Sequence, residues 1–529
     1  MIPASPPVIV ESKGASEMKK RYAKHPKAAV IEDVDGKPGK KTIEELLWGD
    51  LLDLQDEVSG DFVRVKVRPH KGGPRITGWM KKTDFTKKPL LEVTFVDIGQ
   101  GDGCVVVTPD QRVIVIDAGE DDNMSRYLHW RLGYPSAKRP ARVHAAVISH
   151  PDQDHYRGFR DIFQADWATI DTVYQNGLVE RKATPMLGPR TEGKLKIYTD
   201  LIDSTKKLRR VLEDDAAANS GKVYPGMLRQ ALTDGKFGDF RMLSRDDGYI
   251  PGFEDGEKIS IQVLGPVTEK DANGKVIGLR RLGAPGVTKN GHSVVLRLTF
   301  GNTRVLLGGD LNIPSEKLLL ESWVGREMPK KPKKSAPPEE HAKFAEEKRK
   351  FIRDARKLIE VDVAKSCHHG SADFSSLFLE AVHPVATVIS SGDNEPHSHP
   401  RAETLGAIGL ASRGERPLIY STELARSAVD RIKDPREEQA AIKRLHKQVL
   451  AEKDKAKRKK LAKKFRDLVD DTVKRSVQMY GAIYLRTDGT RAVIGQRFEK
   501  RGSGGTWDLC YLEPDTDGKL EYHSKHAKH

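Results

Sequence analysis

The stretch SHPDQDHYRG (149–158) carries four potential metal ligands: His150, Asp152, Asp154 and His155. It directly follows the apolar run VHAAVI (143–148), which is typical of a buried strand. Carboxylate oxygens and imidazole nitrogens are the donors that zinc, manganese and iron accept in proteins. Taken one at a time, each residue also fits a polar turn before a helix, with its side chain as the N-cap. The four together favour a metal-binding loop at a strand end.

Further apolar runs end at a glycine, an aspartate or a histidine in the same way. Examples are VIVIDAG (113–119), LLGGD (306–310), VDVAKSCHHG (361–370) and ATVISSGD (386–393). Such runs are typical of buried strands whose C-terminal ends carry polar loops into a site. With helical segments between them, they predict an α/β sandwich that carries its chemistry on loops.

The motif H-x-D-x-D-H after a strand resembles the metal motif of the metallo-β-lactamase fold, in which H-x-H-x-D-H is usual. Asp152 stands where the second histidine is usual, which favours oxygen-preferring ions such as manganese. Other motifs extend the match: VDIGQGDG (96–103), VIVIDAG (113–119), NGHSVVLRL (290–298), LLGGDL (306–311), SCHHGS (366–371) and SGDNEPHSHP (391–400). Their order and spacing resemble the C-terminal nuclease-like domain of the ComEC competence family, over about 91–422 and again over 478–498. The resemblance implies an αββα sandwich and a metal-dependent hydrolase.

The resemblance also implies roles for the residues that match. His150, Asp152, Asp154 and His155 are the first group of metal ligands. Asp310, in the GGD turn, is the carboxylate that bridges two ions, and His369 is the last ligand. The candidate catalytic residues are Asp154, His368, His397 and His399. His368 is expected to face the substrate, while His397 and His399 line the opening as proton donors or phosphate contacts, unless they are an ordinary pair of loop histidines.

The third histidine motif of the fold has no clear counterpart in this chain. Asn290 matches its position, with Ser293 nearby, and His292 either replaces the missing ligand or points away. The implied cofactor is a pair of divalent ions, Zn²⁺ or Mn²⁺, and we expect one of the two positions to be loosely held. Three further residues are expected to support ligands or to contact substrate: Asp97, Gln100 and Asp117.

The N-terminal part has a different pattern. Residues 1–41 mix Pro, Gly, Lys and Asp without periodicity, and we expect a flexible arm. Residues 42–88 alternate apolar and charged positions, as in GDFVRVKV (60–67), and resemble a bacterial SH3-like domain, a small β-barrel. Its aromatic residues predict either a groove for a protein or peptide ligand or ordinary core packing: Trp48, Phe62 and Trp79.

Residues 89–529 are assigned to the metallo-β-lactamase-fold domain, with insertions at 178–250, 326–360 and 424–475. The last insertion predicts a basic helical hairpin, because apolar residues recur at helical spacing around KDKAKRKKLAKKFR (453–466). Its candidate nucleic-acid contacts are Lys455, Lys457, Arg458, Lys459, Lys460, Lys463 and Lys464. A solvated helix face is the alternative interpretation of this charge.

Composition narrows the classes of function. The chain has 529 residues with 91 Lys and Arg against 76 Asp and Glu, a net charge of +15 that favours a polyanionic partner such as DNA. It has only 3 cysteines and no CxxC pair, so a metal must be held by histidine and carboxylate side chains. No apolar stretch is long enough to span a membrane, and residues 1–26 lack the pattern of a secretory signal, so we expect a cytoplasmic protein.

Three functions remain open from the sequence. The first is a metal-dependent phosphodiesterase or nuclease that acts on DNA, which the ComEC-like motifs and the basic helices favour. The second is a hydrolase of small phosphodiesters or esters, similar to phosphorylcholine esterases. The third is a non-catalytic binding protein that a metal stabilises.

Overall fold

The computed structural model describes residues 19–70, 72–218, 221–392, 398–414, 416–422, 435–474, 481–502 and 505–523. The chain divides into two compact units, Met1–Lys88 and Pro89–His529. In the described part of the chain, no helix combines the length and the apolar character needed to cross a membrane.

The first unit is built from strands. Its described strands are β1 (Lys19–Ala23), β2 (Lys27–Val34), β3 (Lys37–Leu47), β4 (Leu51–Ser59), β5 (Phe62–Val67), β6 (Ile76–Lys81) and β7 (Phe85–Thr86). They pair in the order β3-β2-β6-β5-β4-β1-β7. Along β5, Val63, Val65 and Val67 are buried while the basic residues between them are not, as the alternation predicts. This strand-rich region is consistent with a small barrel-like domain.

The prediction of a flexible arm over residues 1–41 is wrong from Lys19 onward. Strand β1 pairs antiparallel with β4 and β7, and β2 pairs with β3 and β6. Ala28 and Val30 of β2 enter the core of this unit. The polar composition of the segment hid these strands, because their stability comes from backbone pairing with partners that lie elsewhere in the sequence. Residues 1–18 lie outside the described residues.

The aromatic residues of the first unit mostly serve its core. Trp48 and Trp79 are 4% and 1% exposed, and Phe62 is half-buried. The burial of the two tryptophans favours core packing over a ligand groove.

The second unit is an αββα sandwich. Its first sheet has the described order β14-β12-β11-β10-β9-β8-β23-β24-β25-β26, and its second sheet has the order β15-β18-β19-β20-β21-β22. The strands of the first sheet are β8 (Leu91–Phe95), β9 (Gly103–Val107), β10 (Val113–Ala118), β11 (Ala141–Val147), β12 (Ala168–Gln175), β14 (Phe237–Met242), β23 (Ile483–Thr487), β24 (Ala492–Gly502), β25 (Gly505–Pro514) and β26 (Leu520–Tyr522). Those of the second are β15 (Ser260–Gly265), β18 (Val295–Phe300), β19 (Thr303–Leu307), β20 (Val363–Lys365), β21 (Ala386–Ile389) and β22 (Leu418–Ser421). A small third sheet contains β13 (Ile197–Tyr198), β16 (Glu269–Lys270) and β17 (Val276–Arg280).

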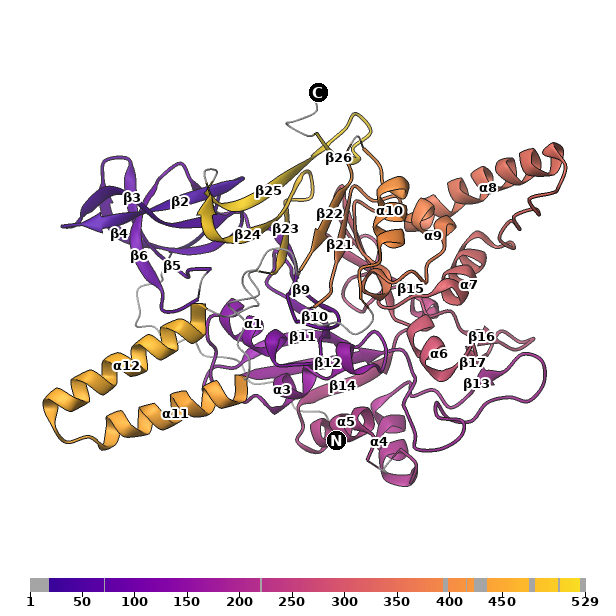
Figure 1. The fold of residues 1–529 in the computed structure, drawn as a ribbon, viewed down its shortest axis with the longest axis horizontal. Helices are drawn as coiled ribbons and strands as arrows, with labels where there is room; N and C mark the ends of the chain where they lie inside the picture. Colours follow the sequence, from indigo (N-terminus) through magenta and orange to yellow (C-terminus); the bar gives the residue numbers. More distant parts are fainter. Residues whose placement is uncertain are drawn as a thin grey trace, which may run out of the picture. The chain divides into compact units, whose positions relative to one another are not determined.

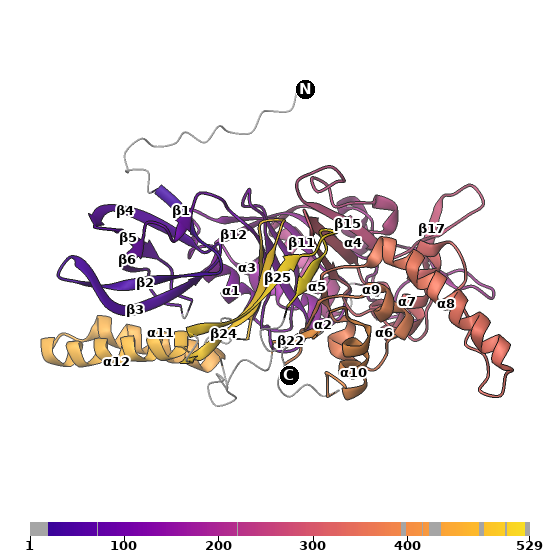
Figure 2. The same ribbon diagram turned by 90° about the horizontal axis from the view of Figure 1, so that it is seen from above.

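Helices cover the outer faces of both large sheets. The first face carries α1 (Asn123–Arg131), α3 (Phe159–Gln164), α4 (Thr205–Asp214) and α5 (Val223–Thr233). The second carries α7 (Ile313–Val324), α8 (Pro338–Ile359) and α9 (Ser376–Val382). Short helices α2 (Gln153–Tyr156), α6 (Pro285–Gly291) and α10 (Ala402–Ala411) lie in connections. Figure 1 shows α1, α3 and α5 beside β11, β12 and β14, and Figure 2 shows α7, α8 and α9 next to one another.

The main core lies between the two sheets. Val106 of β9 and Ile114 of β10 face it from the first sheet, and Leu296 of β18 and Val305 of β19 face it from the second. Alternate residues of the same strands, such as Val105, point the other way and pack under the covering helices. Both sheets are therefore apolar on two faces, which explains the nearly continuous apolar runs in the sequence.

The segment 178–250 is not a separate insertion, contrary to the sequence-based expectation. Strand β14 pairs parallel with β12 and extends the first sheet. Leu208 of α4 and Leu228 of α5 are buried in the core between this sheet and its covering helices. The contribution of this segment to the first sheet and its covering helices was hard to see in the sequence. Only one face of each helix and of the strand is apolar, and the connections between them are polar.

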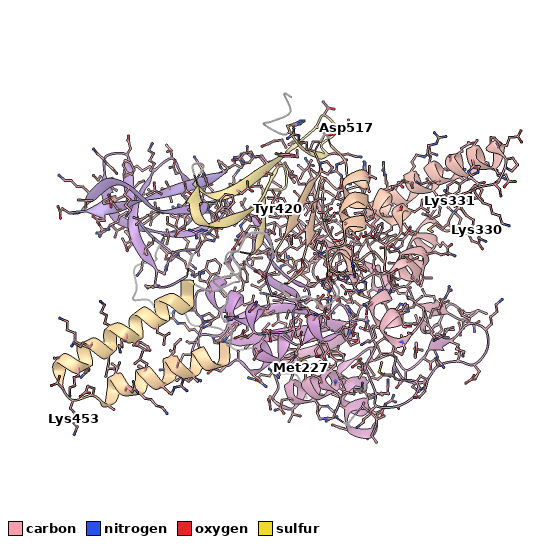
Figure 3. All side chains as sticks on the ribbon, viewed as in Figure 1. Met227, Lys330, Lys331, Tyr420, Lys453 and Asp517 are labelled. Atoms are coloured by element: carbon pink, nitrogen blue, oxygen red, sulfur yellow. The ribbon has the colours of Figure 1, made fainter. Side chains whose placement is uncertain are left out.

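The other two expected insertions are helical in the structure. Helix α8 lies within 326–360 and buries Phe351 and Ala355. Helices α11 (Pro435–Ala451) and α12 (Lys455–Lys474) lie within 424–475 and contact each other, with Lys453 in the turn between them (Figure 3). Beyond this hairpin, β23 pairs antiparallel with β8 and returns the chain to the first sheet.

Candidate metal centre

The metal centre lies where several strands of the two sheets end. His150 and His155 follow β11, Asp310 follows β19, and His369 follows β20. Strand β11 runs parallel to β10, and β20 runs parallel to β19, so each pair delivers its loops to one edge of its sheet. Asp102 precedes β9, which is antiparallel to β10, and therefore lies at the same edge. Loops distant in the sequence thus meet at a common site.

Imidazole nitrogens and carboxylate oxygens converge in this site. The Nε2 atom of His369 lies 3.1 Å from Oδ2 of Asp310 and 3.3 Å from Oδ2 of Asp154. The Nε2 atom of His155 lies 3.3 Å from Oδ2 of Asp310 and 3.9 Å from Oδ2 of Asp154. Both Nε2 atoms are buried and make no hydrogen bond within the described residues. We refer to Asp154, His155, Asp310 and His369 as the four-residue cluster.

Other groups hold the opposite nitrogen of each ring. Nδ1 of His155 lies 2.8 Å from Oδ2 of Asp117, and Nδ1 of His369 lies 3.0 Å from the carbonyl oxygen of Ser390. An acceptor at Nδ1 keeps the proton on that atom and leaves the lone pair of Nε2 directed into the site. This arrangement is characteristic of histidines that bind a metal.

The charges of the cluster are strongly coupled. Burial alone would lower the pKa of His155, but the nearby carboxylates, above all Asp310, hold that pKa well above its usual value. Burial likewise opposes the charged form of His369, and Asp310 and Asp102 together raise its pKa well above the usual value. Burial would raise the pKa of Asp310, yet the two imidazoles keep it well below its ordinary range. The site therefore holds buried negative charge that needs cationic partners.

Three members of the cluster, Asp154, His155 and His369, offer ligand atoms that all lie within 4.8 Å of one another, as one divalent cation requires. Ligand bonds of about 2.0–2.2 Å in a tetrahedral site place ligand atoms about 3.3–3.6 Å apart. The four nitrogen-to-oxygen distances in the cluster, 3.1 to 3.9 Å, bracket that spacing. An ion bound there supplies Lewis acidity, which lowers the pKa of a water molecule toward neutrality.

In the first half of the predicted two-ion site, His150 offers a ligand atom within 4.8 Å of ligand atoms of His155 and Asp310, whereas Asp152 is engaged by other groups. The ligands expected in this half are His150 and Asp152, whose Nε2 and Oδ2 atoms lie 3.5 Å apart. However, Oδ1 of Asp152 forms an ion pair with Nζ of Lys289. In the amide orientation that satisfies its hydrogen bonds, Asn290 donates to Oδ2 of Asp152 at 2.7 Å. Both oxygens of Asp152 are thus in use, and Lys289 provides the positive charge in this half.

Helix α6 positions these residues. Lys289 is 7% exposed and also pairs with Oε1 of Glu180 at 2.6 Å. Burial would raise the pKa of Asp152, but His150 and Lys289 lower that pKa to about 2. His292, at the end of α6, places Nε2 2.6 Å from the carbonyl oxygen of Arg280, so it points away from the cluster rather than replacing the missing ligand.

Comparisons with known proteins bear on this geometry. The protein-family model described as "Metallo-beta-lactamase superfamily" matches residues 103–365. The chain contains a metallo-beta-lactamase superfamily domain. The crystal structure of Zn(2+)-bound PqqB from Methylobacterium extorquens is similar over 61% of this chain and 85% of its own chain, at 9% sequence identity and a TM-score of 0.28. The search of curated proteins found no match.

Besides Lys289, the sequence analysis missed Asp102 and Lys365 of the metallo-beta-lactamase domain. Asp102 lies 3.1 Å from Nδ1 of His369, and Lys365 forms an ion pair with Asp102. Lys365 also donates to the carbonyl oxygen of Gly309 at 3.0 Å and lies 3.6 Å from Oδ1 of Asp310. The available signals were an aspartate inside the quoted QGDG motif and a lysine at the end of an otherwise apolar strand.

Two further histidines, His368 and His399, lie beside the metallo-beta-lactamase site. Nε2 of His368 lies 3.9 Å from Oδ2 of Asp310, and the rings of His368 and His399 are 5.7 Å apart. Burial lowers the pKa of His368. Both His368 and His369 adopt left-handed backbone conformations, with φ of 49° and 53°, which turn their side chains into the site from one short segment. His397 lies outside the described residues.

The supporting residues predicted from the sequence divide into two groups. Asp117 and Ser293 contact the ligands: Ser293 places Oγ 3.2 Å from Nδ1 of His150 and accepts a hydrogen bond from the backbone N–H of Asp310 at 3.0 Å. The structure does not bring the other two, Asp97 and Gln100, into the cluster. Oδ1 of Asp97 instead accepts a hydrogen bond from the backbone N–H of Gly99, within its own turn.

Proposed function

We propose that this protein hydrolyses phosphodiester bonds, with DNA as its substrate, by means of a divalent cation held in the four-residue cluster. The observation that carries this proposal is the convergence of two buried imidazoles and two carboxylates, with nitrogen-to-oxygen distances of 3.1 to 3.9 Å. Carboxylate-rich sites suit the hard cations that act on phosphate esters. The buried cations Lys289 and Lys365 offset part of the carboxylate charge beside the cluster, which lessens its repulsion of an anionic substrate.

The chain's own residues supply orientation and proton transfer. Asp117 and Asp102 hold the rings of His155 and His369, so that the cluster needs little rearrangement to bind its ion. His368 and His399 beside the site provide imidazoles for proton transfer to or from the substrate.

The choice of DNA rests on charge outside the site. Helix α12 carries Lys457, Arg458, Lys459, Lys460, Lys463 and Lys464, whose side chains are exposed. A row of cations on one helix contacts a phosphate backbone without reading its sequence. The side chain of Lys455 lies outside the described residues.

The test is release of acid-soluble label from single- and double-stranded DNA by the purified chain, without metal and with Mn²⁺ or Zn²⁺. We expect metal-dependent cleavage that Asp310→Ala and His155→Ala each reduce by at least about a hundredfold, because each removes a ligand of the ion. Asp517→Ala removes an exposed carboxylate in the turn before β26 (Figure 3) and is the matched control.

The same preparation distinguishes the alternatives. Absence of DNA cleavage by metal-loaded protein contradicts the DNA proposal, and hydrolysis of a small diester such as bis(p-nitrophenyl) phosphate then identifies a small-molecule phosphodiesterase. If neither substrate is cleaved although the ion is bound, the phosphodiesterase proposal is wrong.

A further inference from the structure

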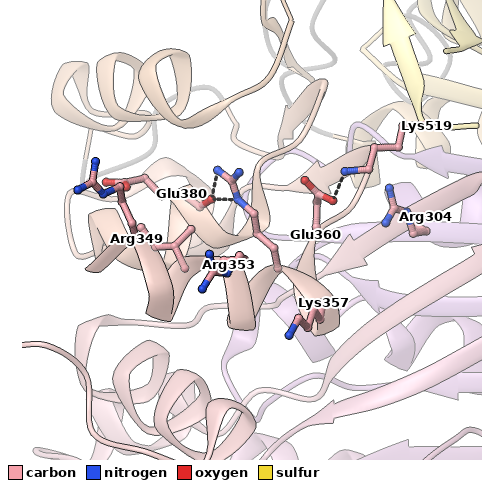
Figure 4. Close-up of a pocket in the computed structure, with 9 residues that line it drawn as sticks. Arg304, Arg349, Arg353, Lys357, Glu360, Glu380 and Lys519 are labelled. Carbon is pink, nitrogen blue, oxygen red and sulfur yellow. Dashed lines mark hydrogen bonds and ion pairs between the residues drawn. The ribbon is translucent and has the colours of Figure 1, made fainter. Parts of the chain in front are cut away.

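A strongly basic cavity of about 560 Å³ lies beside the C-terminal half of α8, at the start of β19 and the turn before β26. Its basic lining residues are Arg304, Arg349, Arg353, Arg356, Lys357 and Lys519. Two carboxylates, Glu360 and Glu380, and one apolar side chain, Ile352, complete the lining (Figure 4). Cations therefore outnumber carboxylates threefold, and only one lining side chain is of an apolar type.

Four of the six cations contact acceptors of the fold. Arg304 forms an ion pair with Oδ2 of Asp362 at 3.4 Å, and Lys357 forms one with Oδ1 of Asp354 at 3.1 Å. Lys519 forms an ion pair with Oε2 of Glu360 at 2.9 Å. Arg356 donates from Nε and Nη2 to the carbonyl oxygen of Glu380 at 3.0 and 2.9 Å (Figure 4). The hydrogen bonds of Arg356 fix its guanidinium without neutralising it, because a backbone carbonyl carries no net charge. This side of the cavity is therefore ordered and remains positive.

The exposed side of the cavity concentrates like charge. Arg349, Arg353 and Lys357 follow one another at four-residue spacing, so they lie on one face of α8. Like charges at this spacing destabilise a helix. Neither Arg349 nor Arg353 forms an ion pair within the described residues, and the carboxylate of Glu380 is engaged by Lys348 at 2.7 Å. Within the described residues, Lys357 pairs with Oδ1 of Asp354 at 3.1 Å, so the uncompensated charge of this face lies on Arg349 and Arg353.

We propose that this cavity binds the phosphate groups of a nucleic acid strand. Guanidinium groups match phosphate oxygens in geometry and in charge, and several arginines around one polar cavity form a typical phosphate site. The excess of cations over carboxylates in the lining favours an anionic ligand over an uncharged one. The choice of nucleic acid rests on the proposed function, whereas the preference for phosphate rests on the cavity itself.

The position of the cavity indicates a long ligand. Arg304 lies near the start of β19 and Asp310 follows its end, so this strand separates the cavity from the metal centre. The 5 residues of β19 span about 17 Å. A nucleic acid strand advances about 3.4 Å per nucleotide, so about five nucleotides or more are needed to reach from one site to the other. A polymer meets this requirement, and a single nucleotide does not.

The experiment measures the Kd of the full chain for a long single-stranded phosphorothioate oligonucleotide, which resists hydrolysis, at several salt concentrations. Arg349→Ala/Arg353→Ala is the test variant. We expect its Kd at low salt to rise at least about tenfold. The slope of log affinity against log salt should become shallower by about 1.4, because two phosphate contacts are lost. Hydrolysis of bis(p-nitrophenyl) phosphate, which is too small to reach the cavity, should be unchanged.

The matched control is Lys330→Ala/Lys331→Ala, which removes the same charge from exposed positions outside the cavity (Figure 3). The inference is overturned if the test variant keeps the parent Kd and salt slope, or if the control weakens binding equally. A loss of binding to anionic phospholipid vesicles, without loss of oligonucleotide binding, also overturns it and identifies a membrane ligand. If no phosphodiester is hydrolysed but the test variant still binds strands more weakly, the proposed function fails and this inference stands.

Discussion

Asp117 joins an uncommon backbone conformation to a supporting position at the metal centre. Its φ is 55°, in the left-handed region that aspartate tolerates better than most residues. In this conformation its carboxylate accepts hydrogen bonds from the N–H and the hydroxyl of Ser149, both at 2.7 Å, while it orients His155. One residue therefore connects the end of β10 to the metal-binding loop.

We expect Asp117→Asn to weaken the affinity for the divalent ion by about ten- to a hundredfold. The amide keeps the shape and tolerates the positive φ, but it loses the charge and one acceptor that hold the ring of His155. Competition with a chelating dye measures the affinity. Asp121→Asn, at an exposed position four residues later, is the control, and equal affinities of the parent and Asp117→Asn contradict the proposed role.

Because the carboxyl of Glu316 is buried, we expect the free energy of unfolding to depend on pH, whether or not a divalent ion is bound. Burial raises the pKa of this carboxyl on α7 from about 4.5 to about 8. The folded state then holds a proton that the unfolded state releases above pH 4.5. The stabilisation is complete below that pH and is lost as the pH rises toward 8.

Between pH 6 and pH 8 the parent should therefore lose about 2 kcal/mol of unfolding free energy that Glu316→Gln does not lose. Urea unfolding of both proteins at the two pH values measures the difference. Glu327→Gln, an exposed residue whose side chain is 83% accessible, should follow the parent. Parallel pH profiles for the parent and Glu316→Gln would show that Glu316 is ionised in the folded state.

At the scale of elements, α6 decides how the first half of the metal site is used. This short helix places Lys289 and Asn290 against the two oxygens of Asp152. The neighbouring strands bring His150 and Asp310 to the same edge. Whether Asp152 is available to bind an ion beside them depends on this helix. A lysine ammonium thus lies against the carboxylate of Asp152, one of the predicted metal ligands.

We expect the parent to bind about one divalent ion per chain and Lys289→Met to bind about two, because the substitution leaves Asp152 and Glu180 without their cation. Elemental analysis after gel filtration measures the stoichiometry. Lys275→Met, at an exposed position in a turn, should behave as the parent does. Two tightly bound ions in the parent would contradict this prediction.

At the scale of the whole molecule, the chain consists of two units with separate cores. The first unit buries Leu46, Leu52, Val65 and Met80 among its own strands. The second unit contains the sandwich, the metal centre and the basic cavity. The division at Lys88 coincides with the boundary expected from the change in sequence pattern.

We expect the fragment of residues 1–88 to fold alone, with a cooperative transition and an unfolding free energy of about 3–5 kcal/mol, as is typical of a core of this size. Thermal unfolding followed by circular dichroism measures it. The complementary fragment of residues 89–529 should bind the metal with the affinity of the full chain. A broad, non-cooperative transition of the first fragment would show that its stability depends on the second unit.

The sequence by itself indicated the sandwich and its metal-binding loop, because both depend on local patterns. A buried strand shows as an apolar run, and His150 through His155 are neighbours along the chain. The tertiary structure decided which distant side chains meet them. It engages Asp152 with Lys289, 137 residues away, and places Lys365 against Asp102. It also pairs the polar strand β1 with β4, and β14 with β12. Ion pairs and strand pairing between distant segments depend on how the chain packs, and no local pattern specifies them.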